Sequence, residues 1–309
     1  MRNNNRRKNI DNKPKIEYTN IFKVKKSNEL LTFLLEKLNT SRNNVKNLLS
    51  NHQVLVNGSV VSQYNFSLAK EDEVKISKHP ITDNPRGQRT KPKRLPKIDI
   101  IYEDDDFFAI NKPAGLLSVE SDKDNESAFS YVLAYMQQES KTNRPFVIHR
   151  IDKETSGVLV FAKSPVIQSK LRLNWNDFVE TREYFAVVKG KLPKKSDTII
   201  CNLLEDENNM VYVSNKDGQK SITHYEVLNE KNGLSLLRVL IDTGRKNQIR
   251  VVLNHLGNPI CGDDKYDERG QFKRLMLHAS KLSFKHPFKD DMITIQSRIP
   301  GTFTSLFQK

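Results

Sequence analysis

A cluster of polar residues separates two apolar segments in the stretch VIHRIDKETSGVLVFAKS, residues 147–164. The cluster contains one aspartate, Asp152, close to an arginine and to a Thr-Ser-Gly sequence. A carboxylate held in such a position can act as a nucleophile or as a general base. A single aspartate in a loop is more often a turn or cap residue. The cluster alone leaves both interpretations of Asp152 open.

Two familiar catalytic signatures do not fit this cluster. A protein kinase has His-Arg-Asp without an intervening residue, together with a glycine-rich loop and Asp-Phe-Gly, and the sequence lacks this combination. A serine hydrolase places its nucleophile in Gly-x-Ser-x-Gly, and Ser156 is not in that setting. The histidines show no HExxH spacing and the two cysteines no CxxC spacing, so we expect no metal site.

The elements that must position Asp152 can be predicted from hydrophobic periodicity. Residues 147–148 and 158–162 predict two strands, which would hold the polar loop at both ends. Strand-forming segments outnumber helical ones in residues 98–309, and hairpins join many of them. This pattern predicts an α+β domain with a mixed, largely antiparallel sheet. The segment RKNQIRVVLNHLG predicts a helix that ends before Gly257.

Residues 17–79 predict a small α+β domain of their own. The segments SNELLTFLLEKL and TSRNNVKNLLSNHQ predict two helices, with Ser27 and Ser41 as their N-caps. The segment VLVNGSVV predicts a hairpin about Asn57-Gly58, because both turn residues accept a positive φ.

The stretch SRNNVKNLLSNHQVLVNGSVV resembles the S-four-type RNA-binding domain, named after a ribosomal protein of the small subunit. The resemblance implies that Arg42 and Lys46 bind RNA. They are four residues apart and share one helix face, although a solvated charged face is the alternative. Residues 1–16, with six Lys/Arg, predict a disordered basic arm. Residues 80–97, with four prolines and six Lys/Arg, predict a semi-extended basic linker.

The charge of the whole chain points to a polyanionic partner. Lys and Arg number 51 against 37 Asp and Glu, a net charge of +14, which favours RNA through counterion release. A merely soluble basic protein and an anionic membrane surface are the alternatives that charge alone leaves open. No stretch approaches the roughly 20 apolar residues of a membrane helix, and the first residues lack the apolar region of a secretory signal. With Cys201 and Cys261 far apart, we expect a cytoplasmic protein without disulfides or a membrane segment.

Five ordered motifs between residues 98 and 309 resemble those of the RluA family of pseudouridine synthases. In chain order they are INKPAGL, HRIDKETSGVLVFAK, REYFAVVKG, TGRKNQIRVVLNHLGNPICGDDKY and LMLHASKLSF. The resemblance implies the pseudouridine synthase fold and the isomerisation of uridine to pseudouridine in RNA. In that reaction the base leaves the ribose, rotates and is rejoined through carbon 5. No atom or electron is gained or lost, so no cofactor is expected.

The resemblance also assigns catalytic roles. Asp152 matches the essential aspartate and would be the nucleophile, so it must be ionised, and we expect its pKa to be held down in the pocket. Arg250 matches the arginine that pairs with this aspartate. Tyr184 matches the tyrosine that stacks on the target base and could assist deprotonation at carbon 5. Without the motif, Tyr184 could equally be a core residue of a strand.

Further residues are implied in substrate binding. Arg150 matches the residue that fills the gap left when the uridine is flipped out of its stack. Thr155 belongs to the turn that fixes the Asp152 loop, and Lys112 lies in the INKPAGL motif. With Arg42 and Lys46 they complete the predicted substrate-binding set.

Two departures from the family pattern bear on the site. The family commonly has His-Gln-Ile-Arg-Val-His where this chain has Asn247 and Val252 at the two histidine positions. Substrate choice or rate could differ as a result. We expect large-subunit ribosomal RNA as the target, with transfer RNA as an alternative and a monomer as the default oligomeric state. A non-catalytic RNA-binding or ribosome assembly factor of the same fold is the rival from another class.

Overall fold

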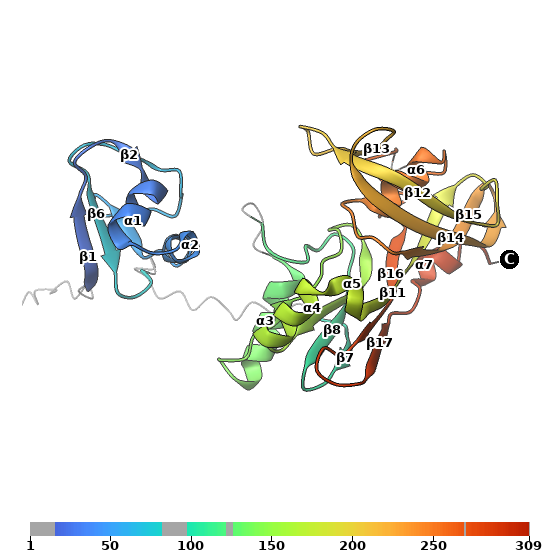
Figure 1. Ribbon diagram of the computed structural model, residues 1–309, viewed down its shortest axis with the longest axis horizontal. Helices are drawn as coiled ribbons and strands as arrows, with labels where there is room; N and C mark the ends of the chain where they lie inside the picture. The colour runs from blue at the N-terminus through green and yellow to red at the C-terminus, as the bar shows by residue number, and fades with distance from the viewer. Residues whose placement is uncertain (1–15, 82–97, 122–125, 269, 309) are drawn as a thin grey trace, which may run out of the picture. The chain divides into compact units, whose positions relative to one another are not determined.

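The computed structural model describes residues 16–81, 98–121, 126–268 and 270–308, which fall in two compact units within residues 1–91 and 92–309 (Figure 1). The predicted basic arm, apart from Ile16, lies outside the described residues. So does the predicted linker beyond Ile81. None of the helices in the described ranges is long and apolar enough to cross a membrane.

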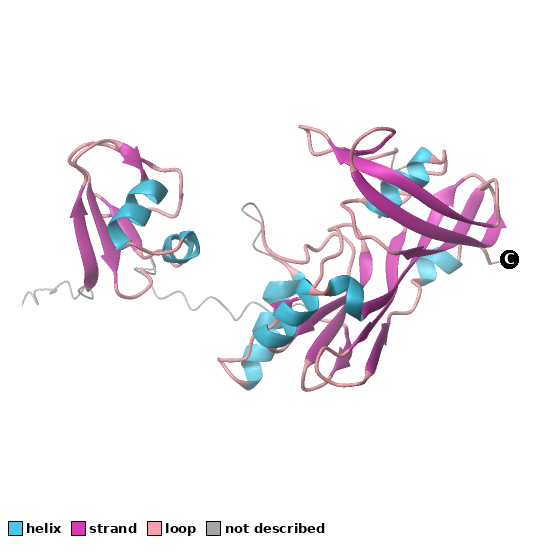
Figure 2. Ribbon diagram, in the orientation of Figure 1, coloured by secondary structure: helices cyan, strands magenta, loops and turns pink. Residues whose placement is uncertain are grey.

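The smaller unit is an antiparallel sheet packed against two helices (Figure 2). Its sheet order is β1-β6-β3-β4, and a two-stranded ribbon β2-β5 lies beside it in the same unit. The strands are β1 Tyr18–Lys23, β2 Asn28–Glu29, β3 Val54–Val56, β4 Ser59–Val60, β5 Ser67–Leu68 and β6 Glu73–Ser77. The helices are α1 Leu30–Leu38 and α2 Arg42–Ser50. Leucines and valines from both helices and the sheet form its core.

Of three predictions for this unit, the Ser41 cap and the Asn57-Gly58 hairpin turn are confirmed and the Ser27 cap is wrong. Ser41 caps α2 by accepting a backbone hydrogen bond of 3.3 Å from the first turn. Asn57 and Gly58 have φ values of 50° and 83°, as the hairpin prediction requires. Ser27, by contrast, does not cap α1, which begins at Leu30. The two residues between them form β2 and pair with β5, so tertiary pairing outweighs the local capping signal.

The larger unit is built on one sheet in which nearly every neighbouring pair is antiparallel. The path runs β13-β12-β14-β15-β11-β16-β10-β8-β7, with β17 beside β16 and β9 beside β10. Only the β10–β16 pair is parallel among these described strands. The strands are β7 Ile100–Glu103, β8 Phe107–Lys112, β9 Phe146–Val147, β10 Ser156–Ala162, β11 Val179–Lys189, β12 Ser196–Glu205, β13 Val211–Ser214, β14 Gln219–Lys231, β15 Leu234–Ile241, β16 Leu277–Lys285 and β17 Met292–Gln296. The predicted mixed, largely antiparallel α+β fold is confirmed.

Strand β10 is buried on both faces, which explains its unbroken apolar sequence. Val158 and Val160 face a core that includes helix α4, Pro165–Leu173. Leu159 and Phe161 face a second core that includes helix α3, Ala128–Glu139. Because side chains alternate along a strand, the two helices cover opposite faces of the sheet. This places the start of β10, and the loop before it, on a rigid support.

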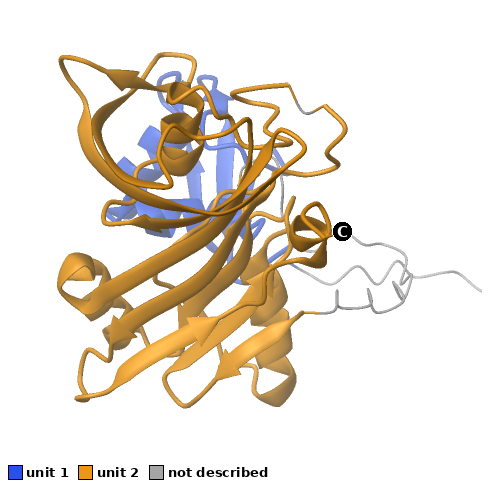
Figure 3. Cartoon of the chain, turned by 90° about the vertical axis from the view of Figure 1, so that its right-hand side faces the viewer, with its two compact units in different colours: residues 1–91 blue, residues 92–309 orange. Residues whose placement is uncertain are grey.

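Helix α6, Gln248–His255, packs at the other end of the sheet. The strands of the β12–β14 region curl around it, as Figure 3 shows for the larger unit. Ile249 and Leu253 join the core of β11 and β15, whereas Val251 and Val252 join a small core with β12 and β13. The helix ends as predicted, with Gly257 at φ 78° just beyond it. Two short helices complete the unit, α5 Trp175–Phe178 and α7 Gly301–Thr304.

Candidate active site

The loop that carries Asp152, residues 148–155, connects β9 to β10 and is pinned through its backbone. The Ser118 hydroxyl donates to the Ile151 carbonyl at 2.7 Å, and the Gly115 N–H donates to the Lys153 carbonyl at 2.9 Å. Beyond the loop, Gly157 has φ 115°, and a Cβ there would lie 2.0 Å from the Ala279 carbonyl oxygen. Only glycine fits that position. The Thr-Ser-Gly sequence therefore lets β10 begin in close contact with β16.

Lys112 lies beneath this loop, and its position contradicts the predicted role in substrate binding. Its side chain is fully buried. The ammonium group donates to the backbone carbonyls of Pro113, Leu116 and Lys153 at 3.0, 2.6 and 3.0 Å. An ammonium group has three donors, so none is left for RNA. Burial lowers the pKa of Lys112 to about 7. Lys112 supports the loop from inside the protein.

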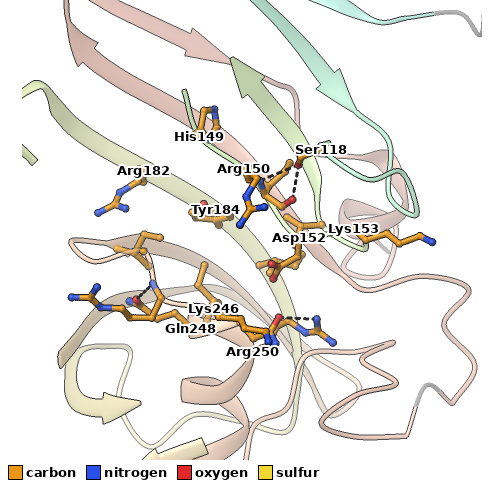
Figure 4. A pocket seen from close by; sticks show the side chains of 18 of the residues that line it. Ser118, His149, Arg150, Asp152, Lys153, Arg182, Tyr184, Lys246, Gln248 and Arg250 are labelled. Atoms are coloured by element: carbon orange, nitrogen blue, oxygen red, sulfur yellow. Dashed lines mark hydrogen bonds between the residues drawn. The ribbon is translucent and has the colours of Figure 1, made fainter. Parts of the chain in front are cut away.

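A cleft of about 660 Å³ lies in front of the loop, and Figure 4 shows the side chains that line it. The Asp152 loop forms one wall and helix α6 with the turn before it forms the other; Tyr184 of β11 lies between them. The cleft thus brings together Asp152, Tyr184 and Arg250, which come from three separate segments of the sequence. Arg150 and Thr155 line it as well.

Asp152 is half-buried, and within the described ranges its carboxylate forms no hydrogen bond or ion pair with another side chain. Burial raises its pKa above the ordinary value of 3.8, and the nearby positive charges of Arg250, Lys112 and Lys265 oppose the rise without cancelling it. The expectation of a lowered pKa is therefore wrong, because desolvation outweighs the surrounding cations. The carboxylate is less acidic and less solvated than an ordinary aspartate.

Arg250 faces the cleft but makes its ion pair with Asp263, not with Asp152. Its Nε and Nη2 atoms donate to the two carboxylate oxygens of Asp263 at 2.8 and 2.6 Å, and both side chains are almost fully buried. Burial opposes the charge on Arg250, but the bonds to Asp263 outweigh it and raise the pKa of the guanidinium. Arg250 therefore does not form the predicted direct ion pair with Asp152. Arg250 lowers the pKa of Asp152 through its charge alone.

Asn247 completes the support of Arg250. Its Oδ1 accepts from Nη1 of Arg250 at 3.2 Å, and its Nδ2 donates to the Tyr266 hydroxyl at 3.1 Å. The Tyr266 ring lies under the guanidinium, 5.2 Å from centroid to Cζ. Asn247 has φ 53°, a left-handed conformation that asparagine and histidine adopt more readily than most residues. Asn247, at a position where the family commonly has histidine, therefore forms hydrogen bonds with both Arg250 and Tyr266.

Tyr184 projects from β11 beside a bulge. The pairing of β11 with β16 shifts register between Glu183 and Tyr184, and such bulges re-aim side chains. Burial raises the pKa of the Tyr184 phenol to about 12; the Arg182 charge opposes this and the Asp152 charge adds to it. The phenol is therefore neutral near pH 7.

The remaining loop residues have distinct positions. Arg150 is exposed at the cleft, whereas Thr155 is buried and closes a turn by donating its N–H to the Asp152 carbonyl at 3.1 Å. His149 accepts from the Val160 N–H at 3.0 Å through Nε2, and burial lowers its pKa to about 4. His149 is therefore a neutral residue tied to the β10 backbone.

The two predicted RNA-binding residues of the smaller unit lie on α2. Arg42 and Lys46 are both exposed, at the margin of the helix face that buries Val45 and Leu49. Both side chains are therefore on the surface of that unit.

Sequence reasoning missed two residues that line the cleft, Arg182 and Trp175, and Asp263, which binds Arg250. Arg182 lies two positions before Tyr184 on β11 and shares its face, so strand periodicity could have found it. Asp263 stands in the quoted GDDKY motif, but its partner is set by tertiary structure. Trp175 gave no periodic signal. Among the described residues no group of histidine, cysteine or carboxylate side chains could hold a metal ion, and Cys201 and Cys261 are free.

The chain has clear relatives among known proteins. The family model of RNA pseudouridylate synthase matches residues 106–255. An uncharacterized RNA pseudouridine synthase of Bacillus subtilis, YlyB, is 30% identical over 291 residues, which cover 92% of this chain and 94% of that protein. The ribosomal large subunit pseudouridine synthase D of Buchnera aphidicola is 31% identical over 305 residues, covering 92% of this chain and 95% of that one.

A solved structure supports the fold assignment. The human RNA pseudouridylate synthase domain containing 4 superposes with a TM-score of 0.56 at 21% identity, over 67% of this chain and 90% of that one. The chain therefore belongs to the RNA pseudouridylate synthase family, whose members are isomerases.

Proposed function

We propose that this protein converts uridine to pseudouridine in large-subunit ribosomal RNA, with Asp152 as the nucleophile. The observation that carries the assignment is the state of the Asp152 carboxylate. It lies in the cleft without a side-chain partner in the part of the chain that the structure describes, whereas the neighbouring Arg250 and Asp263 bind each other. An unpaired, poorly solvated carboxylate is more reactive toward carbon than one held in an ion pair.

The proposed reaction uses each wall of the cleft. Asp152 attacks the flipped uridine, either at carbon 6 of the base or at carbon 1 of the ribose. The bond from nitrogen 1 to the ribose breaks, the base rotates, and a bond from carbon 5 to the ribose forms. Carbon 5 loses its proton, nitrogen 1 gains one, and Asp152 is released as a carboxylate. Tyr184 stacks on the base, Arg250 supplies positive charge beside the reacting carboxylate, and Arg150 fills the gap in the RNA.

The RNA target is proposed from the relatives. Ribosomal large subunit pseudouridine synthases of Zymomonas mobilis and Buchnera aphidicola are 28% and 31% identical, over about nine-tenths of this chain in each case. The net charge of +14 supports an RNA partner. Pseudouridine mapping of ribosomal and transfer RNA, in cells with and without the gene, tests the proposal. We expect loss at one or more sites of the large-subunit RNA. Loss only in transfer RNA would assign the other substrate, and loss nowhere would favour a non-catalytic factor.

The nucleophile has its own test. Asp152→Asn should abolish isomerisation while RNA binding, measured by fluorescence anisotropy of labelled RNA, stays within a few fold. Detectable turnover by this variant would refute the assignment of Asp152.

The smaller unit is proposed to recruit the RNA. In this organisation residues 17–79 form an S-four-type domain, residues 1–16 and 80–97 are basic flanking segments, and residues 98–309 form the catalytic domain of a cytosolic monomer. The exposed Arg42 and Lys46 support the assignment. Removal of residues 1–97 should weaken RNA binding and reduce its dependence on salt. An unchanged salt slope would show that another surface recruits the RNA.

A further inference from the structure

Trp175 is the only tryptophan of the chain and lies at the cleft. It is half-buried at the start of α5 and packs against the core that contains Ile148 and Leu171. Its ring is 5.7 Å from the imidazole of His149, with 32° between the planes. A large aromatic ring that is partly exposed in an RNA-binding cleft is suited to stack on a base.

His149 and strand β10 support the ring of Trp175. His149 is held by the Val160 N–H at 3.0 Å, and β10 itself is buried on both faces. The indole therefore rests on an imidazole that cannot shift without disturbing the sheet. Little conformational entropy would be lost when a flat ligand stacks on such a platform.

Arg182 places a positive charge beside the platform. It lies two residues before Tyr184 on β11, so the two side chains share a face and are about 7 Å apart along the strand. Its guanidinium donates to the Asp242 carbonyl and lines the cleft. Burial lowers the pKa of His149 and the Arg182 charge adds to this effect, whereas burial raises the pKa of Tyr184 and the Arg182 charge opposes the rise.

The cleft thus contains two successive arrangements. The inner one joins Asp152 to Tyr184, where the target uridine is proposed to react. The outer one consists of His149, Trp175 and Arg182, and Arg182 lies two residues before Tyr184 on β11. Each combines an aromatic ring with a charged group, but the outer one contains no carboxylate. An aromatic ring beside an arginine is the combination that binds single-stranded nucleotides.

We propose that Trp175, His149 and Arg182 form a second nucleobase subsite, which binds an unpaired base next to the target uridine in the same RNA strand. Trp175 stacks on this base and Arg182 binds an adjoining phosphate. The subsite would select RNA in which the neighbour of the target is also unstacked. The inference rests on the proposed function for the position of the target, but base stacking on Trp175 can be measured without catalysis.

The single tryptophan makes the test direct. The full chain carrying Asp152→Asn is titrated at low salt with a short oligouridylate and with an abasic oligomer of the same number of phosphates, while anisotropy of a labelled oligomer follows binding. We expect oligouridylate to quench the tryptophan fluorescence in step with binding, and the abasic oligomer to bind without quenching. Equal responses to both, binding without quenching by oligouridylate, or no binding of oligouridylate would each overturn the subsite.

Substitutions provide a second, independent measurement in the active enzyme. Trp175→Leu should raise KM for the mapped ribosomal RNA fragment by about 5- to 100-fold, the range expected for loss of one stacked base. The value of kcat should change much less, and Trp175→Phe should restore most of the lost affinity. Phe288→Leu is the matched control, because Phe288 is an exposed ring outside the cleft. A fall in kcat without a change in KM, or equal effects of Leu and Phe at position 175, would assign Trp175 to packing alone. Because mapping tests the function and fluorescence tests the subsite, failure of one is distinguishable from failure of the other.

Discussion

The two walls of the cleft are held in opposite ways. The loop wall, residues 148–155, is fixed through backbone carbonyls, which accept hydrogen bonds from Ser118, Gly115 and Lys112. Of its two carboxylates, Asp152 is the one that lines the cleft, and it takes no part in this support. The helix wall is fixed through side chains, by the buried pair of Arg250 and Asp263.

This difference separates groups that support the site from groups that can react. On the helix wall the buried guanidinium of Arg250 is paired with Asp263 in the folded protein. On the loop wall the support comes from neutral carbonyls and one buried ammonium, which leaves the carboxylate unpaired. An unpaired buried charge lowers stability, and such costs are common at catalytic sites. Substitutions of the two carboxylates, Asp152 and Asp263, should therefore change stability in opposite directions.

Asp263→Asn should have the largest effect. It leaves the buried guanidinium of Arg250 without its carboxylate, and breaking a buried pair in this way typically costs about 3–5 kcal/mol. Urea unfolding of the larger unit should show a loss of this size, together with a severe loss of isomerisation. Glu226→Gln, which breaks an exposed pair with Arg238, is the matched control and should cost less than about 1 kcal/mol. Similar losses for both variants would mean that the Arg250 pair is not structurally special.

Lys112→Met should be the next largest change, about 1–3 kcal/mol, because three buried carbonyls lose their donor. The pH dependence identifies the cause. The pKa of Lys112 is lowered from 10.5 to about 7 in the folded protein. Between these values the unfolded chain holds a proton that the folded chain has released, so stability rises with pH. The wild type should gain stability relative to Lys112→Met from about pH 7 to 10.5, measured by urea unfolding. A constant difference across this range would show that Lys112 stays charged.

The sequence predicted which elements would meet at the cleft but not which charges would pair. Periodicity and motif order placed Asp152, Tyr184 and Arg250 correctly on a loop, a strand and a helix. The partner of Arg250 depends on how the segment after α6 folds back, and no local pattern specifies that. The INKPAGL motif assigns Lys112 to substrate binding, because a sequence does not show whether a lysine points outward or into a ring of carbonyls.

The pKa of Asp152 was missed for a related reason. The number of nearby cations can be predicted from motifs, whereas burial can be known only from the packed structure. Here burial has the larger effect. The start of α1 was misplaced because Asn28–Glu29 pair with a strand almost forty residues away. Each error concerns a contact between distant segments.

Asp152→Asn should change stability in the opposite direction to Asp263→Asn and by a smaller amount. The folded protein raises the pKa of Asp152 above 3.8, so the ionised carboxylate costs stability at any pH above the folded value. A neutral asparagine removes this cost, and the melting temperature should rise by a few degrees at pH 7. The gain should vanish as the pH falls below 3.8, where both states of the wild type are protonated. A lower melting temperature for the variant at pH 7 would mean that Asp152 is a structural partner.

Asn247→His should have the smallest effect on activity at neutral pH. At low pH it tests whether the helix wall depends on Asn247 as well as on Asp263. Histidine tolerates the left-handed backbone of this position, and a neutral imidazole can still accept from Arg250. Once protonated, it has no acceptor to offer and repels the guanidinium. We expect kcat/KM within a few fold of wild type at pH 8, and an additional loss of about tenfold as the imidazole gains its proton. Asn247→Gln is the control, since it cannot titrate and should follow the wild-type pH profile. Identical profiles for the histidine and glutamine variants would show that position 247 does not act on Arg250, and that the helix wall depends on Asp263 alone.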